Sequence, residues 1–184
     1  MKKKLEWNMA RAIAKQFSDL IRPQVERIEF AGSLRRHKST VGDIEIVLIP
    51  KRIKQAILAG LWPLDTCEYD LLEERLQKLR DNEVIEQGRW WGPRHKELFY
   101  QNAPFDLYIV RPPAQWGVIL TIRTGPAEFS RRLVTLQSQG GLMPAGFKFK
   151  DGALWYEGQV VDTPEEEDVF RALGQAWIKP RDRR

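Results

Sequence analysis

The feature that most constrains the fold is the segment at residues 43–50, Asp-Ile-Glu-Ile-Val-Leu-Ile-Pro, which has the alternation of a β-strand. Side chains two residues apart on a strand project from the same face, so Asp43 and Glu45 lie on one face and Ile44, Ile46 and Leu48 on the other. Two neighbouring carboxylates repel each other unless a cation lies between them. Oxygen ligands beside a phosphate-bearing substrate suit Mg²⁺. The strand therefore predicts a sheet with an acidic, metal-binding face.

The segment before this strand is short, polar and basic, and it begins with Gly32-Ser33. A glycine allows the backbone to approach a phosphate closely, and a serine hydroxyl adds a donor. Arg35 and Arg36 carry planar guanidinium groups that match phosphate oxygens. A basic phosphate cradle next to an acidic metal site is typical of phosphoryl or nucleotidyl transfer. A solvated strand face beside a basic loop is the alternative that these residues leave open.

Composition narrows the class of protein. The chain has 184 residues and a formal net charge of +5, which favours an anionic partner but is modest support. Its single cysteine, Cys67, excludes an intrachain disulfide framework and a cysteine-based zinc site, and predicts a reduced or buried thiol. No apolar run approaches the length of a membrane span, so we expect a cytoplasmic location, or association with a virus or nucleoid, and no membrane partner.

The periodicity of apolar residues predicts a mixed α/β half followed by a smaller lobe, with the boundary between Val110 and Trp116. Expected helices cover residues 5–21, 53–61, 69–82, 116–124, 127–138 and 163–173, the last with Thr163 as N-cap. Expected strands cover residues 25–31, 43–50, 84–91, 96–101, 105–110, 147–150 and 153–155, with residues 102–104 as a turn.

The sequence resembles the DNA polymerase β-type nucleotidyltransferases, and more closely the family X DNA polymerases. Residues 32–43 fit the pattern G-S-x-R-R-x-x-x-T-x-G-D, and residues 105–110, Phe-Asp-Leu-Tyr-Ile-Val, resemble the family's strand with a third carboxylate. Residues 124–133 resemble its T-G-S-x-x-F-N-R-x-L element, and residues 166–180 resemble its carboxyl-terminal ending. The resemblance implies an α+β fold with a nucleotidyltransferase palm over residues 1–113 and a C-terminal nucleotide-binding lobe over residues 114–184.

The resemblance also implies the site. Asp43, Glu45 and Asp106 correspond to the catalytic, metal-binding triad for two Mg²⁺ ions, with Mn²⁺ as an alternative ion. Ser33 and Arg36 correspond to ligands of the β- and γ-phosphates. The full set of expected nucleotide-binding residues is Gly32, Ser33, Arg36, Gly42, Arg123, Gly125 and Ser130.

The chain departs from the family pattern at several positions. Glu45 replaces the usual aspartate, Ser130 replaces an asparagine that touches the nucleotide, and Val134 replaces an arginine. Ile122 and Arg123 replace the Tyr-Phe pair that checks the sugar, which predicts weak discrimination between deoxy- and ribonucleotides. Because the family element has a cis peptide at this junction, we also expect Gly125-Pro126 to be cis.

Basic clusters next to the acidic site suggest a track for a phosphate backbone, with Arg94, Lys96, Arg131 and Arg132 as candidate DNA contacts. The first hypothesis is therefore a minimal, monomeric, gap-filling polymerase that adds (d)NTP to a DNA primer 3′-hydroxyl and has no lyase or helix-hairpin-helix domain. The second is a nucleotidyltransferase that modifies RNA, a protein or a small molecule, which the Asp-x-Glu spacing keeps open. The third is an inactive nucleic-acid-binding scaffold.

Overall fold

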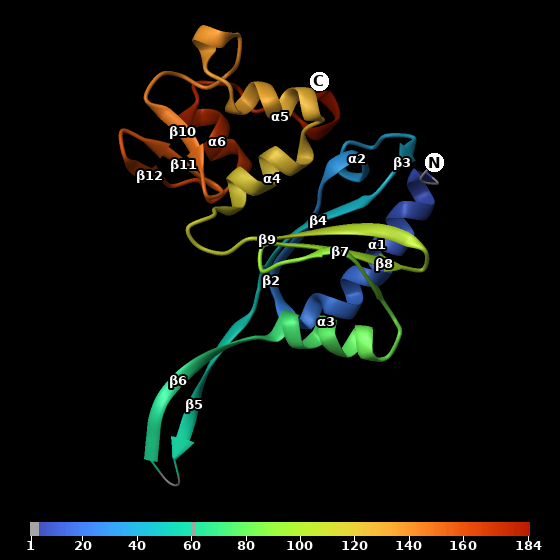
Figure 1. Ribbon diagram of the computed structural model, residues 1–184. Helices are drawn as coiled ribbons and strands as arrows, with labels where there is room; N and C mark the ends of the chain where they lie inside the picture. Colours follow the sequence, from blue (N-terminus) through green and yellow to red (C-terminus); the bar gives the residue numbers. More distant parts are fainter. Residues whose placement is uncertain (1–3, 60–61) are drawn as a thin grey trace.

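The computed structural model describes residues 4–59 and 62–184, and for residues 55–68 it describes the backbone only, without residues 60 and 61. Figure 1 displays a sheet-and-helix body, a smaller lobe beside it and a long hairpin that extends away from the body. The helices are α1 (Trp7–Ile21), α2 (Gly32–Arg35), α3 (Leu71–Asp81), α4 (Trp116–Thr124), α5 (Ala127–Val134) and α6 (Glu166–Ala172). The strands are β1 (Leu5–Glu6), β2 (Val25–Phe30), β3 (Thr40–Val41), β4 (Ile44–Pro50), β5 (Arg52–Ala59), β6 (Trp62–Asp70), β7 (Glu86–Trp91), β8 (His95–Tyr100), β9 (Ala103–Ile109), β10 (Phe147–Lys150), β11 (Ala153–Tyr156) and β12 (Gln159–Val161).

The body is built on a five-stranded sheet with the order β2-β4-β9-β8-β7. The β4–β9 pair is parallel and the other pairs are antiparallel, so the sheet is mixed. Its first face is covered by α1 and α3, and the apolar residues of β4 and β9 on that face are fully buried there. The alternation of β4 thus works as the sequence predicts, because burial of Ile44, Ile46 and Leu48 leaves Glu45 on the second face.

The second face is covered only in part. Val47 and Val110 pack there with Trp116 and Leu120 of α4, which joins the lobe to the sheet. The lobe has its own core, formed by α4, α5, α6 and the β10-β11-β12 sheet. Polar side chains of β4, β9 and β8 occupy the part of this face that α4 does not cover, and this is where the candidate site lies.

Ion pairs hold the lobe against α2. Glu166 of α6 accepts from Arg35 at 2.8 Å and from Arg183 at 2.7 Å, and both of its carboxylate oxygens are used. Thr124 of α4 accepts from Arg35 through its hydroxyl and from Arg36 through its carbonyl. The phosphate-cradle segment is therefore fixed to the lobe by charged hydrogen bonds. The division into residues 1–113 and 114–184 remains a prediction.

Two sequence-based assignments of the body are wrong. Residues 53–61 were expected to be helical, but Arg52–Ala59 is strand β5, paired antiparallel with β6. The tight turn before β9 is at Gln101 and Asn102, both with positive φ, and β9 already begins at Ala103. Cys67, expected as a reduced or buried thiol, lies outside the described side chains.

Three assignments in the lobe are also corrected. Helix α5 ends at Val134 rather than at 138. The N-cap of α6 is Glu165, which forms a capping box with Asp168, because the Thr163 hydroxyl bonds Gln115 instead. Gly125-Pro126 is trans, since the cis peptide bond of the described residues is Pro112-Pro113. No helix among the described residues combines the length and apolarity that a bilayer crossing requires.

Candidate nucleotidyl-transfer site

Acidic side chains from three neighbouring strands lie in a row on the second face of the sheet. Glu45 of β4 is paired in register with Asp106 of β9, and Asp106 is paired in register with Glu97 of β8. Neighbouring strands are about 4.8 Å apart, so these three side chains start close together. Asp43 immediately precedes β4, two residues before Glu45. The fold therefore places all three predicted catalytic carboxylates on one face.

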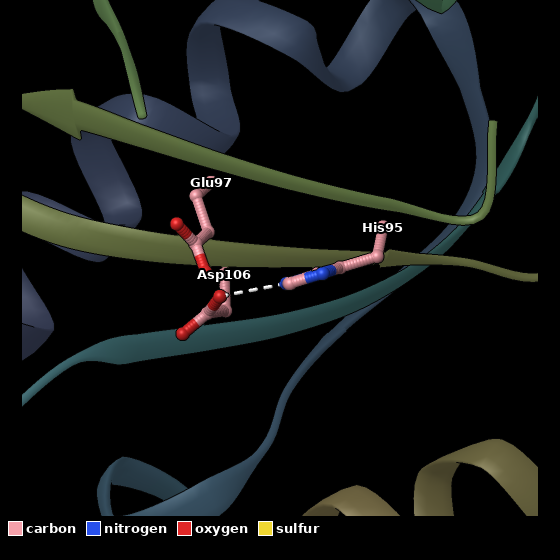
Figure 2. Close-up of side chains that lie close together, drawn as sticks. All are labelled: His95, Glu97 and Asp106. Atoms are coloured by element: carbon pink, nitrogen blue, oxygen red, sulfur yellow. Dashed lines mark hydrogen bonds and ion pairs between the residues drawn. The ribbon is translucent and has the colours of Figure 1, made fainter. Parts of the chain in front are cut away.

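The Asp106 carboxylate interacts with His95 of β8, on the opposite side of β9 from β4. His95 Nε2 lies 2.7 Å from Asp106 Oδ1, and Figure 2 shows the imidazole directed at that carboxylate. Among the described residues, His95, Glu97 and Asp106 are the one group of three with potential metal-ligand atoms all within 4.8 Å of one another. The predicted triad of Asp43, Glu45 and Asp106 does not meet that limit in this conformation.

Burial and neighbouring negative charge both raise the pKa of the Glu45 carboxyl group. Burial raises the pKa of its carboxyl group to about 7, and the charges of Asp43 and Asp106 act in the same direction. Arg36 and Arg123 lower this pKa but do not cancel the effect. A carboxyl group that resists ionisation because it is buried and has other carboxylates beside it is a group whose charged form a cation would stabilise.

We expect Glu45→Gln to remove much of the pH dependence of stability in metal-free protein. A carboxyl group with a pKa of about 7 when folded and about 4.3 when unfolded binds more protons in the folded state between these values, so stability falls as the pH rises through that window. The difference in free energy of unfolding, variant minus native, should rise by up to roughly 3 kcal/mol between pH 5 and pH 8. Urea unfolding in EDTA at both pH values measures it.

Glu26→Gln on β2 is the matched control, because it makes the same chemical change at an exposed side chain of the same sheet. It should leave the pH dependence of the native chain in place. An equal pH dependence for native and Glu45→Gln protein would contradict the burial and charge crowding described at Glu45.

A pocket with a volume of about 340 Å³ lies between the sheet and the lobe, and Asp43 and Glu45 line it, whereas Asp106 is not among its lining residues. This volume lies within the usual range for ligand pockets. The predicted residues that line it are Arg36, Asp43, Glu45, Arg123, Gly125 and Ser130. Residues far apart in the sequence, which were assigned separately to metal and nucleotide, thus meet in one cavity that two guanidinium groups and two carboxylates line.

Gly32 and Ser33 lie at the start of α2, next to this pocket. Gly32 has a φ of +54°, and a Cβ at this position would lie 1.5 Å from Glu45 Oε2. Only glycine allows both this backbone conformation and this approach of the Glu45 carboxylate. The buried Ser33 hydroxyl has no hydrogen-bond partner, and nothing fills the space where a Cβ of Gly42 would point. An unsatisfied hydroxyl donor at the start of α2 fits an incoming anionic group.

Arg123, which stands where the family has an aromatic residue, packs over the ring of Tyr108. The Arg123 guanidinium lies 3.9 Å from the centre of the Tyr108 ring, and His95 stacks on the same ring at 4.9 Å. Burial raises the pKa of the Tyr108 hydroxyl. Ser130 donates to the carbonyl of Ile122 at 2.6 Å, so its hydroxyl supports the end of α4 as well as lining the pocket.

The four candidate DNA contacts differ in position. Arg94, Arg131 and Arg132 are exposed, whereas Lys96 is 2% exposed and pairs with Glu73 of α3 at 2.9 Å. Lys96 faces the buried side of the sheet together with Leu98, so this placement does not support a contact between Lys96 and DNA. Its neighbours His95 and Glu97 face the site, and sequence reasoning missed their roles. The alternation with Leu98 was the signal that could have found them.

The chain is similar to DNA polymerases in sequence and in structure. The family model of the DNA polymerase β thumb matches residues 119–184. DNA polymerase lambda of Rattus norvegicus is 29% identical over 170 residues, which cover 83% of this chain and 28% of that protein. The structure described as "Crystal structure of Leishmania infantum polymerase beta: Ternary P/T complex" matches with a TM-score of 0.71 and 16% identity, and covers 99% of this chain and 77% of that chain.

The fold is thus the α+β fold of polymerase β, with a mixed sheet flanked by helices. The resemblance to the family X DNA polymerases, indicated by the sequence, is confirmed by these matches. The chain spans 28% of the length of the curated relative.

Proposed function

We propose that this chain, acting as a monomer, transfers a nucleotidyl group from a (d)NTP to a primer 3′-hydroxyl and fills short gaps in DNA in the manner of a family X polymerase. The observation that carries the proposal is the pairing of Glu45 and Asp106 in register on parallel strands, beside a pocket lined by Arg36 and Arg123. A cavity lined by both carboxylates and guanidinium groups is what a metal-bound triphosphate requires.

The residues present fit divalent metal ions. Asp43, Glu45 and Asp106 supply carboxylate oxygens, the donors that Mg²⁺ and Mn²⁺ prefer, and the pKa of Glu45 is raised first by burial and then by the charges of Asp43 and Asp106. When bound, such ions activate the attacking hydroxyl and neutralise charge on the triphosphate. Asp43, Glu45 and Asp106 would hold these ions, and we assign Asp106 to the primer side.

The chain's own groups then position the substrate. Arg36 already lies at the pocket with its Nη1 held by the Thr124 carbonyl at 2.6 Å, so its remaining donors are oriented before a ligand arrives. Ser33 adds a hydroxyl donor, and we place the β- and γ-phosphates against these two residues. Preorganised donors of this kind supply most of the catalysis in phosphoryl transfer, which is largely positioning and charge neutralisation.

Primer extension tests the proposal. The native chain is incubated with a labelled primer on a one-nucleotide gap, a recessed template or a single strand, with dNTPs and either Mg²⁺ or Mn²⁺. We expect addition on the gapped and recessed DNA. Parallel reactions offer RNA and small-molecule acceptors: addition only to one of these would favour the second hypothesis, and DNA binding without addition to any acceptor would favour an inactive scaffold.

Sugar discrimination is expected to be weak. Arg123 stands where the family has an aromatic residue and is held over Tyr108, so no aromatic ring from this position meets the sugar. Paired dNTP and rNTP should differ in kcat/KM by less than about 10²-fold, since a site without a dedicated contact rejects one added hydroxyl poorly. Arg123→Phe should widen the ratio. A native preference for dNTPs well above that ratio would contradict this prediction.

A further inference from the structure

A second ligand set lies on the opposite side of Asp106 from Glu45. His95 and Glu97 belong to β8, project from the same face two residues apart, and flank Asp106 across the β8–β9 ladder. Glu97 is the direct register partner of Asp106, and His95 Nε2 is 2.7 Å from its Oδ1. The potential ligand atoms of all three residues lie within 4.8 Å of one another.

The imidazole is held in place before any ion arrives. Its ring stacks on Tyr108 with 4.9 Å between centroids and 9° between planes, which orients Nε2 towards the carboxylates. The His95 side chain is 34% exposed and that of Asp106 is 20% exposed, so solvent ions reach both. Lys96, the neighbouring cation in the sequence, faces the other side of the sheet and pairs with Glu73.

We propose that His95, Glu97 and Asp106 form a site for a first-row transition divalent cation, which shares Asp106 with the acidic pair on β4. One imidazole nitrogen with two carboxylates suits Mn²⁺ and later metals, whereas Mg²⁺ is held by oxygen ligands and water. Metal–nitrogen and metal–oxygen bonds of about 2.0–2.2 Å bring ligand atoms to about 3 Å from each other, so small side-chain movements close the site. The proposal goes beyond nucleotidyl transfer and does not require it.

Mn²⁺ is the probe, and electron spin resonance of Mn²⁺ bound to the native chain is the measurement. The chain has two histidines, so nitrogen hyperfine coupling from an imidazole has two possible sources. We expect the coupling in native protein, its loss in His95→Gln and its retention in His37→Gln. His37 is the matched control, because it is exposed and stacks on Trp7 away from the carboxylates.

The affinities of the chain for Mn²⁺ and Mg²⁺ provide the second readout. His95→Gln should weaken Mn²⁺ binding about 10-fold or more, with a much smaller effect on Mg²⁺ binding. Glu97→Gln should also weaken Mn²⁺ binding but keep the nitrogen coupling, which guards against a folding defect in one variant. The absence of coupling in native protein, its survival in His95→Gln, or equal losses of Mg²⁺ and Mn²⁺ affinity would overturn the proposal.

Primer extension in Mg²⁺ separates this proposal from the proposed function. A chain that extends primers without nitrogen coupling refutes only the His95 site. A chain that shows the coupling without extension refutes only the polymerase function.

Discussion

Asp106→Asn is expected to lower the rate of single-nucleotide addition by about 10³-fold or more. Asp106 lies on β9 between β4 and β8, where it is in register with both Glu45 and Glu97. The substitution removes one negative charge from the row of carboxylates but keeps the shape of the side chain. Loss of a single preorganised charged or polar group in an active site commonly has an effect of this size. Single-turnover extension of a primer across a one-nucleotide gap measures it.

Asp19→Asn is the matched control. It makes the same chemical change on α1, where Asp19 pairs with Lys15 in an exposed ion pair that contributes little to stability. The asparagine at position 106 still accepts a hydrogen bond from His95, so thermal unfolding of this variant should resemble that of the native chain. Retention of more than about a hundredth of the native rate by Asp106→Asn would contradict the assigned role.

Glu166→Ala is expected to lower the free energy of unfolding by about 3–5 kcal/mol. Glu166 is 4% exposed and lies between Arg35 and Arg183, and the Arg183 side chain is fully buried. Burial lowers the pKa of the Arg183 guanidinium, and its hydrogen bond to Glu166 acts in the opposite direction. Truncation of Glu166 leaves that buried charge without its partner. Urea unfolding at neutral pH measures the loss.

Glu167→Ala supplies the comparison, since Glu167 is the exposed neighbour in the same helical turn. It removes the same charge and should change stability by only a few tenths of a kcal/mol. Similar losses for both variants would mean that helix charge, rather than the buried ion pairs, decides the result.

The ion pairs around Glu166 also bear on the site. Arg35 joins Glu166 to α2, and the adjacent Arg36 is held by Thr124 at the edge of the pocket. Loss of Glu166 should therefore loosen the segment that positions Arg36, and reduce nucleotide affinity in protein that remains folded. The lobe contributes to the site through these bonds as well as through its own pocket-lining residues.

The strongest predictions from the sequence came from strong local patterns. The alternation at the start of residues 43–50 placed Glu45 on the open face, because a one-residue shift would have exposed Ile44, Ile46 and Leu48. The prediction for residues 53–61 failed because Ile53, Ile57 and Leu58 fit a short helix as well as a strand. Pairing with β6, which lies beyond the segment itself, decided the outcome.

The neighbourhood of β8 was predicted least well. A positive charge near an acidic site suggested that Lys96 faces DNA. Lys96 shares the buried face of β8 with Leu98, however, and pairs there with Glu73 of α3. His95 and Glu97 became visible only when the antiparallel register of β8 on β9 set them beside Asp106. Local periodicity gives the face of each residue, whereas register between strands gives its neighbours, and register depends on the whole sheet.

The most direct test of the central claim is a crystal structure of the chain with gapped DNA, a non-hydrolysable dNTP analogue and Mn²⁺, with anomalous scattering used to locate the metal. We predict a manganese peak bonded to Asp43, Glu45 and Asp106, with the β- and γ-phosphates against Ser33 and Arg36. A triphosphate bound elsewhere, or manganese absent from these carboxylates while the analogue is bound, would contradict the account.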